Sequence, residues 1–164
     1  MERGNLFIPG KLPYARGKRP EVDCILCAIR DKDERVKNLV VYEVERFIVT
    51  LNLYPYAPGH LMIFPKSHLL DLREINQEDL KELHRLTTLS LDVLDHLYQP
   101  HGYNLGYNVG VVSGASMEHL HLHIVPRYRN EMGFLDIING ARIIVEDPVE
   151  TKDKLKEAFK QIAF

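Results

Sequence analysis

Three histidines alternate with apolar residues in the segment HLHLHIVPR (119–127), where they are His119, His121 and His123. Successive side chains on a β-strand point to opposite faces, so these imidazoles would share one face and lie roughly 6.6–6.8 Å apart along the strand. Imidazole changes charge near neutral pH, binds metals and acts as a nucleophile. The row therefore predicts a site of catalysis or metal binding.

The only two cysteines, Cys24 and Cys27, form a second candidate site. Their C-x-x-C spacing is compatible with a zinc knuckle, a redox pair or two packed thiols. In a cytoplasmic protein, metal ligands or redox thiols are more expected than a structural disulfide. The spacing alone leaves these alternatives open.

Length, charge and hydropathy exclude several classes of protein. A chain of 164 residues predicts one domain with a sizeable core. The net charge of −2 gives no basic field for nucleic acid or a membrane surface. No stretch approaches the ~20 apolar residues of a membrane span, and residues 1–20 lack the apolar core of a signal peptide. We expect a cytoplasmic protein that binds neither nucleic acid nor membranes.

The elements that must position the histidines follow from the apolar pattern. Residues 1–20, rich in Gly, Pro, Lys and Arg, predict an N-terminal arm before a single domain at 21–164. Leucines at near-helical spacing predict a long helix at 76–99 with Asn76 as its N-cap, and a second amphipathic helix is expected at 147–164. Strands are expected at 39–43, 46–51, 60–64, 103–109 and 118–125. The pattern predicts an α+β fold with an antiparallel sheet of about five strands.

Three blocks of the sequence resemble the histidine triad (HIT) superfamily of nucleotide hydrolases and transferases. They are the histidine segment with its Pro-Arg ending, NLYPYAPGHLMIFPKSH (52–68) and NLGYNVGVVSGAS (104–116). The N-terminal LFIP (6–9) and DCILC (23–27) resemble a branch that contains dinucleoside-tetraphosphate phosphorylases and hydrolases. The resemblance implies a HIT-like fold and a homodimer, with sheets continuous across an interface built partly by the long helix.

The resemblance assigns roles to the histidines. His121 would be the nucleophile that attacks the α-phosphorus of a substrate such as a dinucleoside polyphosphate, forming a covalent nucleotidyl-histidine. Water or inorganic phosphate would then release the nucleotide. His123 would contact phosphate and assist the leaving group. The positions implied in nucleotide or phosphate binding are Asn52, His60, Asn108, Ser113, Gly114, Ala115, Ser116 and His123.

Small residues in the loop 113–116 could cradle phosphate oxygens through backbone N–H groups and hydroxyls. Many family members have Gln at the position of Ala115, so this chain departs from the pattern in its polyphosphate contact. Small residues there also resemble the phosphorylase-like branch.

Family members with a C-x-x-C pair join it to two histidines, which here are His68 and His119. The resemblance therefore implies that Cys24, Cys27, His68 and His119 bind structural zinc, since two thiolates and two imidazoles suit a closed tetrahedral site. The alternative is a metal-free pair packed as small hydrophobes.

Two other functions remain open at this point. A metal-dependent hydrolase or oxygenase would use the three histidines of the row as ligands. A non-catalytic nucleotide-binding scaffold would bind nucleotide without turnover. The sequence also leaves open whether water or phosphate is the acceptor.

Overall fold

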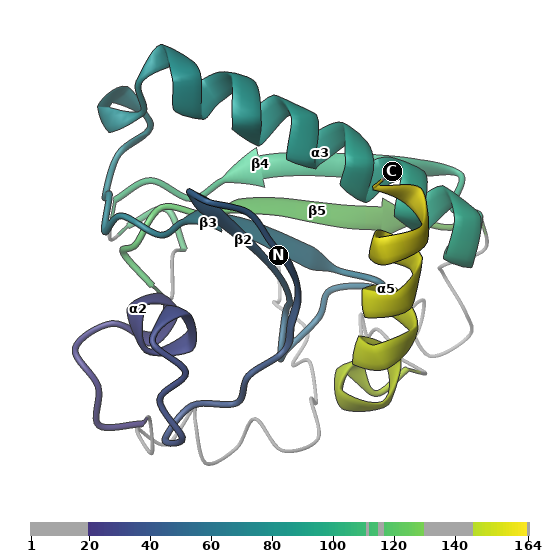
Figure 1. The fold of residues 1–164 in the computed structure, drawn as a ribbon, viewed down its shortest axis with the longest axis horizontal. Coiled ribbons are helices and arrows are strands. Elements are labelled where there is room, and N and C mark those ends of the chain that lie inside the picture. The colour runs from purple at the N-terminus through teal and green to yellow at the C-terminus, as the bar shows by residue number, and fades with distance from the viewer. Residues whose placement is uncertain (1–19, 111, 115–116, 130–145, 164) are drawn as a thin grey trace, which may run out of the picture.

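The computed structural model describes residues 20–110, 112–114, 117–129 and 146–163. Their elements are a short helix α2 (Ile25–Arg30), strands β1 (Val40–Glu43), β2 (Phe47–Leu51) and β3 (Leu61–Pro65), a 3₁₀ turn (Leu72–Glu74), the long helix α3 (Gln77–Tyr98), strands β4 (Gly102–Tyr107) and β5 (Leu122–Arg127), and helix α5 (Pro148–Ile162) (Figure 1). The expected helices and the number of strands are confirmed. Residues 1–19 lie outside the described part, so the boundary of the N-terminal arm stays a prediction.

The five strands form one antiparallel sheet in the order β1-β2-β3-β5-β4. This confirms the α+β class and places β5, the strand that carries His123, between β3 and β4. Cross-strand pairing sets Met62 of β3 and Gly106 of β4 on either side of His123. Directly paired residues share a face of the sheet, so Met62 and Gly106 border His123 on its own face.

Helices α3 and α5 pack on the opposite face of the sheet. Helix α3 begins at the N-cap Asn76, whose side chain accepts from the Asp79 N–H, as its sequence predicts. Helix α5 begins after Asp147, with Pro148 in the first turn where the missing N–H costs nothing. The core between sheet and helices includes the buried residues Ile63, Ile124, Leu86, Leu94, Leu155 and Phe159.

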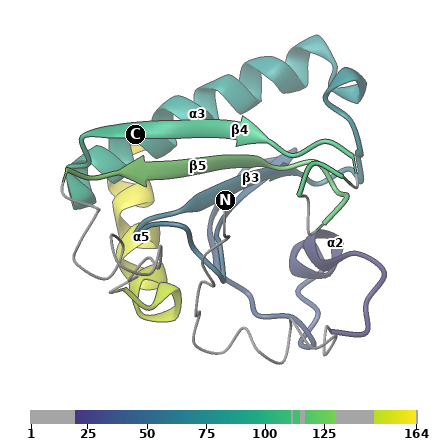
Figure 2. The same ribbon diagram turned by 180° about the vertical axis from the view of Figure 1, so that it is seen from behind.

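Helix α2 covers one end of the other face. Its apolar residues Leu26, Ala28 and Ile29 pack in a smaller core with Ile48 of β2 and Phe64 of β3. In both views α2 and α5 lie at opposite ends of the molecule (Figures 1 and 2). No helix in the described ranges is long and apolar enough to span a membrane.

The strand expected at 118–125 begins only at Leu122, so this expected start is wrong. The partner strand β3 ends at Pro65, which has no N–H to continue the ladder. The chain before Leu122 pairs instead with the turn after β3, where the Leu120 N–H donates to the Leu69 carbonyl. Of the three histidines, only His123 therefore lies within a strand, and His119 is free to turn toward α2.

Candidate active site and metal centre

His121 lies immediately before β5 and is buried. Its Nδ1 is 2.8 Å from the backbone carbonyl of His119. A carbonyl only accepts, so Nδ1 carries the proton of the neutral ring and Nε2 carries the lone pair. Burial lowers the pKa of His121, although the bond to this carbonyl acts in the opposite direction. A neutral imidazole with a defined lone pair is the state that a histidine nucleophile requires.

A chain of hydrogen bonds fixes the proton of His123 in the same way. The Tyr56 N–H donates to His60 Nδ1 over 3.1 Å, so the proton of neutral His60 must be on Nε2. His60 Nε2 is 2.9 Å from His123 Nδ1 and donates to it. His123 therefore carries its own proton on Nε2. Its ring lies edge-on to that of His121, with centroids 4.6 Å apart. The site thus presents a lone pair on His121 and an N–H donor on His123.

Burial keeps the His60 and His123 rings neutral. Burial, reinforced by the neighbouring His123 and His121, lowers the pKa of His60 to about 3. Burial and His121 lower the pKa of His123 to about 4. Both values lie far below the ordinary 6.5. The hydrogen-bond chain therefore persists across the physiological pH range.

These shifts predict a loss of stability in acid. Below about pH 6.5 the unfolded chain protonates His60 while the folded protein does not, so the free energy of unfolding falls as the pH is lowered toward the folded pKa of about 3. The contribution of His60 to the free energy of unfolding is fully present above its ordinary pKa of 6.5. We expect urea unfolding at pH 7 and pH 4.5 to show a smaller acid loss in His60→Gln than in the wild type.

His101→Gln is the matched control, because His101 is exposed on the loop between α3 and β4. It should retain the wild-type acid loss. An equal acid loss in His60→Gln and the wild type would contradict the assignment of a neutral, buried His60.

The other nucleotide-site candidates among the described residues are Asn52, Asn108, Ser113 and Gly114. The backbone N–H of Asn52 donates to the His60 carbonyl, and its side chain accepts from the Tyr54 N–H. Gly114 lies close to Asn108, because a Cβ on Gly114 would be 3.7 Å from Asn108 Nδ2. The Ser113 hydroxyl donates to the Gly110 carbonyl and closes the loop.

Two further candidates, Ala115 and Ser116, lie outside the described residues. A Cβ on Gly106, beside His123, would meet no heavy atom of the described chain within 4 Å. Within the described ranges, the sheet face next to His123 is therefore uncovered at Gly106.

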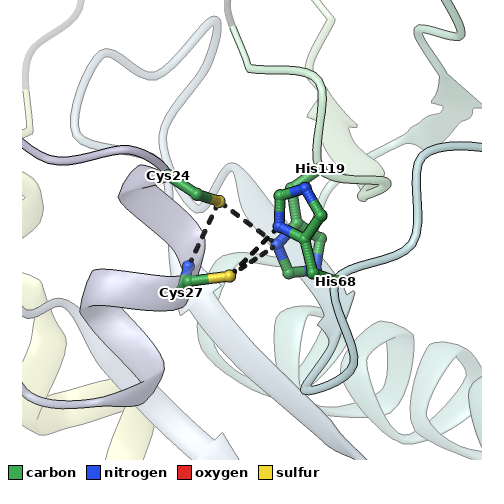
Figure 3. Close-up of side chains that lie close together, drawn as sticks. All are labelled: Cys24, Cys27, His68 and His119. Carbon is green, nitrogen blue, oxygen red and sulfur yellow. Dashed lines mark hydrogen bonds between the residues drawn. The ribbon is translucent and has the colours of Figure 1, made fainter.

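A second cluster lies where α2 meets the turns around β3 and β5. One donor atom from each of Cys24, Cys27, His68 and His119 falls within 4.8 Å of the others (Figure 3). Cys24 Sγ is 3.4 Å from His119 Nδ1. Cys27 Sγ is 3.2 Å from His68 Nδ1 and 3.5 Å from His119 Nδ1. The sequence-predicted ligand set is brought together.

The spacing of these atoms fits zinc. With Zn–S near 2.3 Å and Zn–N near 2.05 Å, a tetrahedron places sulfur and nitrogen about 3.5 Å apart. Three of the four sulfur–nitrogen pairs in the cluster, the two of Cys27 and that of Cys24 with His119, are 3.2–3.5 Å apart. His119 Nε2 donates to the Pro65 carbonyl over 2.9 Å, so its Nδ1 lone pair faces the thiols. The donor types, spacing and tautomer all suit a closed zinc site.

One residue joins the two sites. The ring of His119 belongs to the cysteine cluster, while its carbonyl oxygen holds His121 Nδ1. The three histidines therefore do not converge on one point, and within the described chain the donors close enough to share an ion are those of the Cys₂His₂ cluster. This arrangement does not support a metal bound by all three residues of the row.

Several contacts of the site could not be inferred from the sequence pattern. The Tyr56 N–H and the Pro65 carbonyl fix histidine tautomers. Both are backbone groups, which carry no signal in the amino-acid sequence. The Arg30 guanidinium donates to the Lys66 carbonyl and ties α2 to the turn that carries His68. A basic residue at a helix end is too common to predict this contact.

Comparisons with known proteins agree with this architecture. Residues 33–130 match the family model of the HIT domain. An AP-4-A phosphorylase of Mycobacterium tuberculosis is 38% identical over 109 residues, which are 66% of this chain and 56% of that protein. The chain thus spans little more than half the length of that relative. An asymmetrical bis(5′-nucleosyl)-tetraphosphatase of Schizosaccharomyces pombe is 25% identical over 103 residues, covering 63% of this chain and 57% of that protein.

The structural comparison extends over more of the chain. A zinc-bound histidine triad family protein from Mycobacterium smegmatis matches with a TM-score of 0.70 and 25% sequence identity, covering 86% of this chain and 96% of that structure. The family model covers more than half of the 164 residues and includes His60, His121 and His123. The chain belongs to the HIT domain family.

Proposed function

We propose that this protein cleaves a nucleoside phosphate, such as the dinucleoside polyphosphate diadenosine tetraphosphate (Ap4A), at the α-phosphate through a covalent nucleotidyl-His121. The observation that carries the proposal is the hydrogen bond from His121 Nδ1 to the His119 carbonyl, which leaves the Nε2 lone pair for attack. The 38% identity to an AP-4-A phosphorylase supports the substrate class.

In the first step His121 Nε2 attacks the α-phosphorus. A phosphorus–nitrogen bond forms, and the bond from phosphorus to the bridging oxygen breaks. His123 Nε2–H donates a hydrogen bond to the departing oxygen and stabilises its developing charge. The polyphosphate leaves as an anion, so His123 does not have to lose its proton. The proton of His121 Nδ1 stays on the ring and is held by the carbonyl.

The second step favours inorganic phosphate as the acceptor. A water molecule needs a base to take its proton, but His123 presents an N–H donor at Nε2. Reversing its tautomer would also reverse His60 and set the Nδ1–H of that ring against the Tyr56 N–H. The phosphate dianion has a charged oxygen ready to attack phosphorus. It would displace His121 and release a nucleoside diphosphate.

The test is Ap4A turnover with and without inorganic phosphate, with products separated and ¹⁸O-labelled phosphate as the acceptor. We expect ADP and ATP in equal amounts only when phosphate is present, with the label in the β-phosphate of ADP. AMP and ATP formed without phosphate would contradict the choice of acceptor. Nucleotide binding without turnover of any dinucleoside polyphosphate would contradict the enzymatic proposal and favour the scaffold.

The proposed cofactor is structural zinc held by the Cys₂His₂ cluster. When bound there, zinc would supply a cross-link between α2 and the sheet. It would not activate a reacting water, since four protein donors leave no position for one.

The proposed protein partner is a second copy of the chain. Strand β4 is at the edge of the sheet, so its outer backbone groups could pair with another strand. It also exposes the apolar side chain of Leu105.

A further inference from the structure

The peptide unit between Pro58 and Gly59 is held at both of its polar atoms by side chains from distant segments. The Tyr128 hydroxyl donates to the Pro58 carbonyl over 3.0 Å. The Gly59 N–H donates to Glu146 Oε2 over 3.1 Å. Because the peptide unit is planar, bonds at its carbonyl and its N–H together fix its orientation. This peptide is thus the meeting point of the residue that follows β5 and the residue that precedes the N-cap of α5.

Glu146 is itself held in place. Its other oxygen, Oε1, accepts from the hydroxyl of Tyr98, the last residue of α3, over 2.8 Å. The carboxyl group is half-buried, and burial raises its pKa. Two hydrogen-bond donors, the Gly59 N–H and the Tyr98 hydroxyl, leave this side chain little freedom, so it can act as a rigid link between α3 and the turn.

Gly59 approaches α3 closely. Its φ is +76°, and an added Cβ would lie 3.0 Å from Leu94 Cδ2 and 3.2 Å from the Tyr98 ring. The turn is therefore pressed against the helix at a point where only glycine fits. Glu146 and Tyr128 then decide how the peptide at this point is rotated.

This rotation matters because Gly59 is followed directly by His60. The His60 ring donates from Nε2 to His123 Nδ1 over 2.9 Å, so the ring must be held in one position. A change in the preceding peptide plane moves the backbone from which that ring extends. The hydrogen bonds of Glu146 and Tyr128 to the Pro58–Gly59 peptide form a clamp. This clamp acts on the hydrogen-bond chain that fixes the position of the proton on His123.

We propose that Glu146 is a positioning residue for the active site, and that with Tyr128 it holds the Pro58–Gly59 peptide so that His60 fixes the tautomer of His123. The proposal rests on the proposed function for its kinetic consequence. Glu146 touches no reacting atom, so its effect is expected on the chemical step rather than on substrate affinity.

The kinetic test compares Glu146→Ala with Glu150→Ala, a control that removes the same charge from an exposed position in the first turn of α5. We expect kcat of Glu146→Ala to fall about tenfold with KM within about twofold, since a small misplacement costs mainly transition-state stabilisation. Glu146→Gln should restore most of kcat, because its amide oxygen can accept from Gly59 while its NH₂ group donates to the Tyr98 hydroxyl.

The spectroscopic test needs no substrate. Long-range ¹H–¹⁵N correlation spectra of the wild type should show His60 and His123 as Nε2–H tautomers, and Glu146→Ala should give mixed tautomers for His123. Glu150→Ala should match the wild type. If Glu146→Ala does not fold, Tyr128→Phe removes the other half of the clamp and should give the same change in the spectra.

The two tests separate the two proposals. A wild type that turns over no nucleotide would overturn the proposed function, while the spectra would still decide on the clamp. Wild-type tautomers in both Glu146→Ala and Tyr128→Phe would overturn the clamp, as would a kinetic defect equal in Glu146→Ala and Glu150→Ala.

Discussion

Replacing His121 with Asn will lower kcat by about 10⁴-fold or more, while the protein stays folded and retains the proposed zinc. The Asn amide can still donate to the His119 carbonyl, as His121 Nδ1 does now over 2.8 Å. It has no lone pair on nitrogen with which to attack phosphorus. The substitution therefore removes the nucleophile and leaves the buried hydrogen bond in place.

Rates of Ap4A phosphorolysis and trapping of the intermediate together test this prediction. Wild-type protein mixed with Ap4A in the absence of phosphate and then denatured should carry one nucleoside monophosphate per chain, located on His121 by peptide mass spectrometry. His121→Asn should carry none. His84→Asn is the matched control, because His84 is exposed on α3. Activity of His121→Asn within tenfold of the control, or label on another residue, would contradict the assignment.

Local sequence signals predicted most of the fold. The Asn76 cap and the leucine period located α3 to within one residue at each end. Five apolar segments gave the number of strands, because each segment is short and bounded by turn residues. The start of β5 was not predictable from its own alternation, since it depends on Pro65 in the partner strand.

The candidate site, like the fold, could be predicted only in part from the sequence. The alternation of histidines located the segment of the candidate active site, but it could not show that the His119 ring turns away to the cysteine cluster. The proposed zinc ligands His68 and His119 lie 41 and 92 residues from Cys27, so only the family resemblance joined them. Glu146 and Tyr128 act on a backbone peptide, and no sequence pattern marks such a contact.

Loss of the proposed zinc will lower the melting temperature by about 10 °C or more, and His68→Asn is the variant that shows it most clearly. The imidazole of His68 is exposed, so its removal leaves no cavity. A substitution at such a position normally changes the free energy of unfolding by less than about 0.5 kcal/mol. Without a fourth ligand, however, zinc could no longer tie α2 to the sheet. Helix α2 has six residues and is too short to be stable alone.

The wild type should contain one zinc ion per chain by elemental analysis, and His68→Asn should contain little or none. Chelation should lower the melting temperature of the wild type to that of His68→Asn and leave the variant unchanged. His96→Asn, an exposed substitution on α3, should match the wild type in both measurements.

Below its melting temperature His68→Asn should still turn over nucleotide, because His121 is held by a backbone carbonyl rather than by the metal. A melting temperature that responds to neither zinc nor chelator would contradict the structural role, and loss of bound metal in His121→Asn would point instead to a histidine-row metal site.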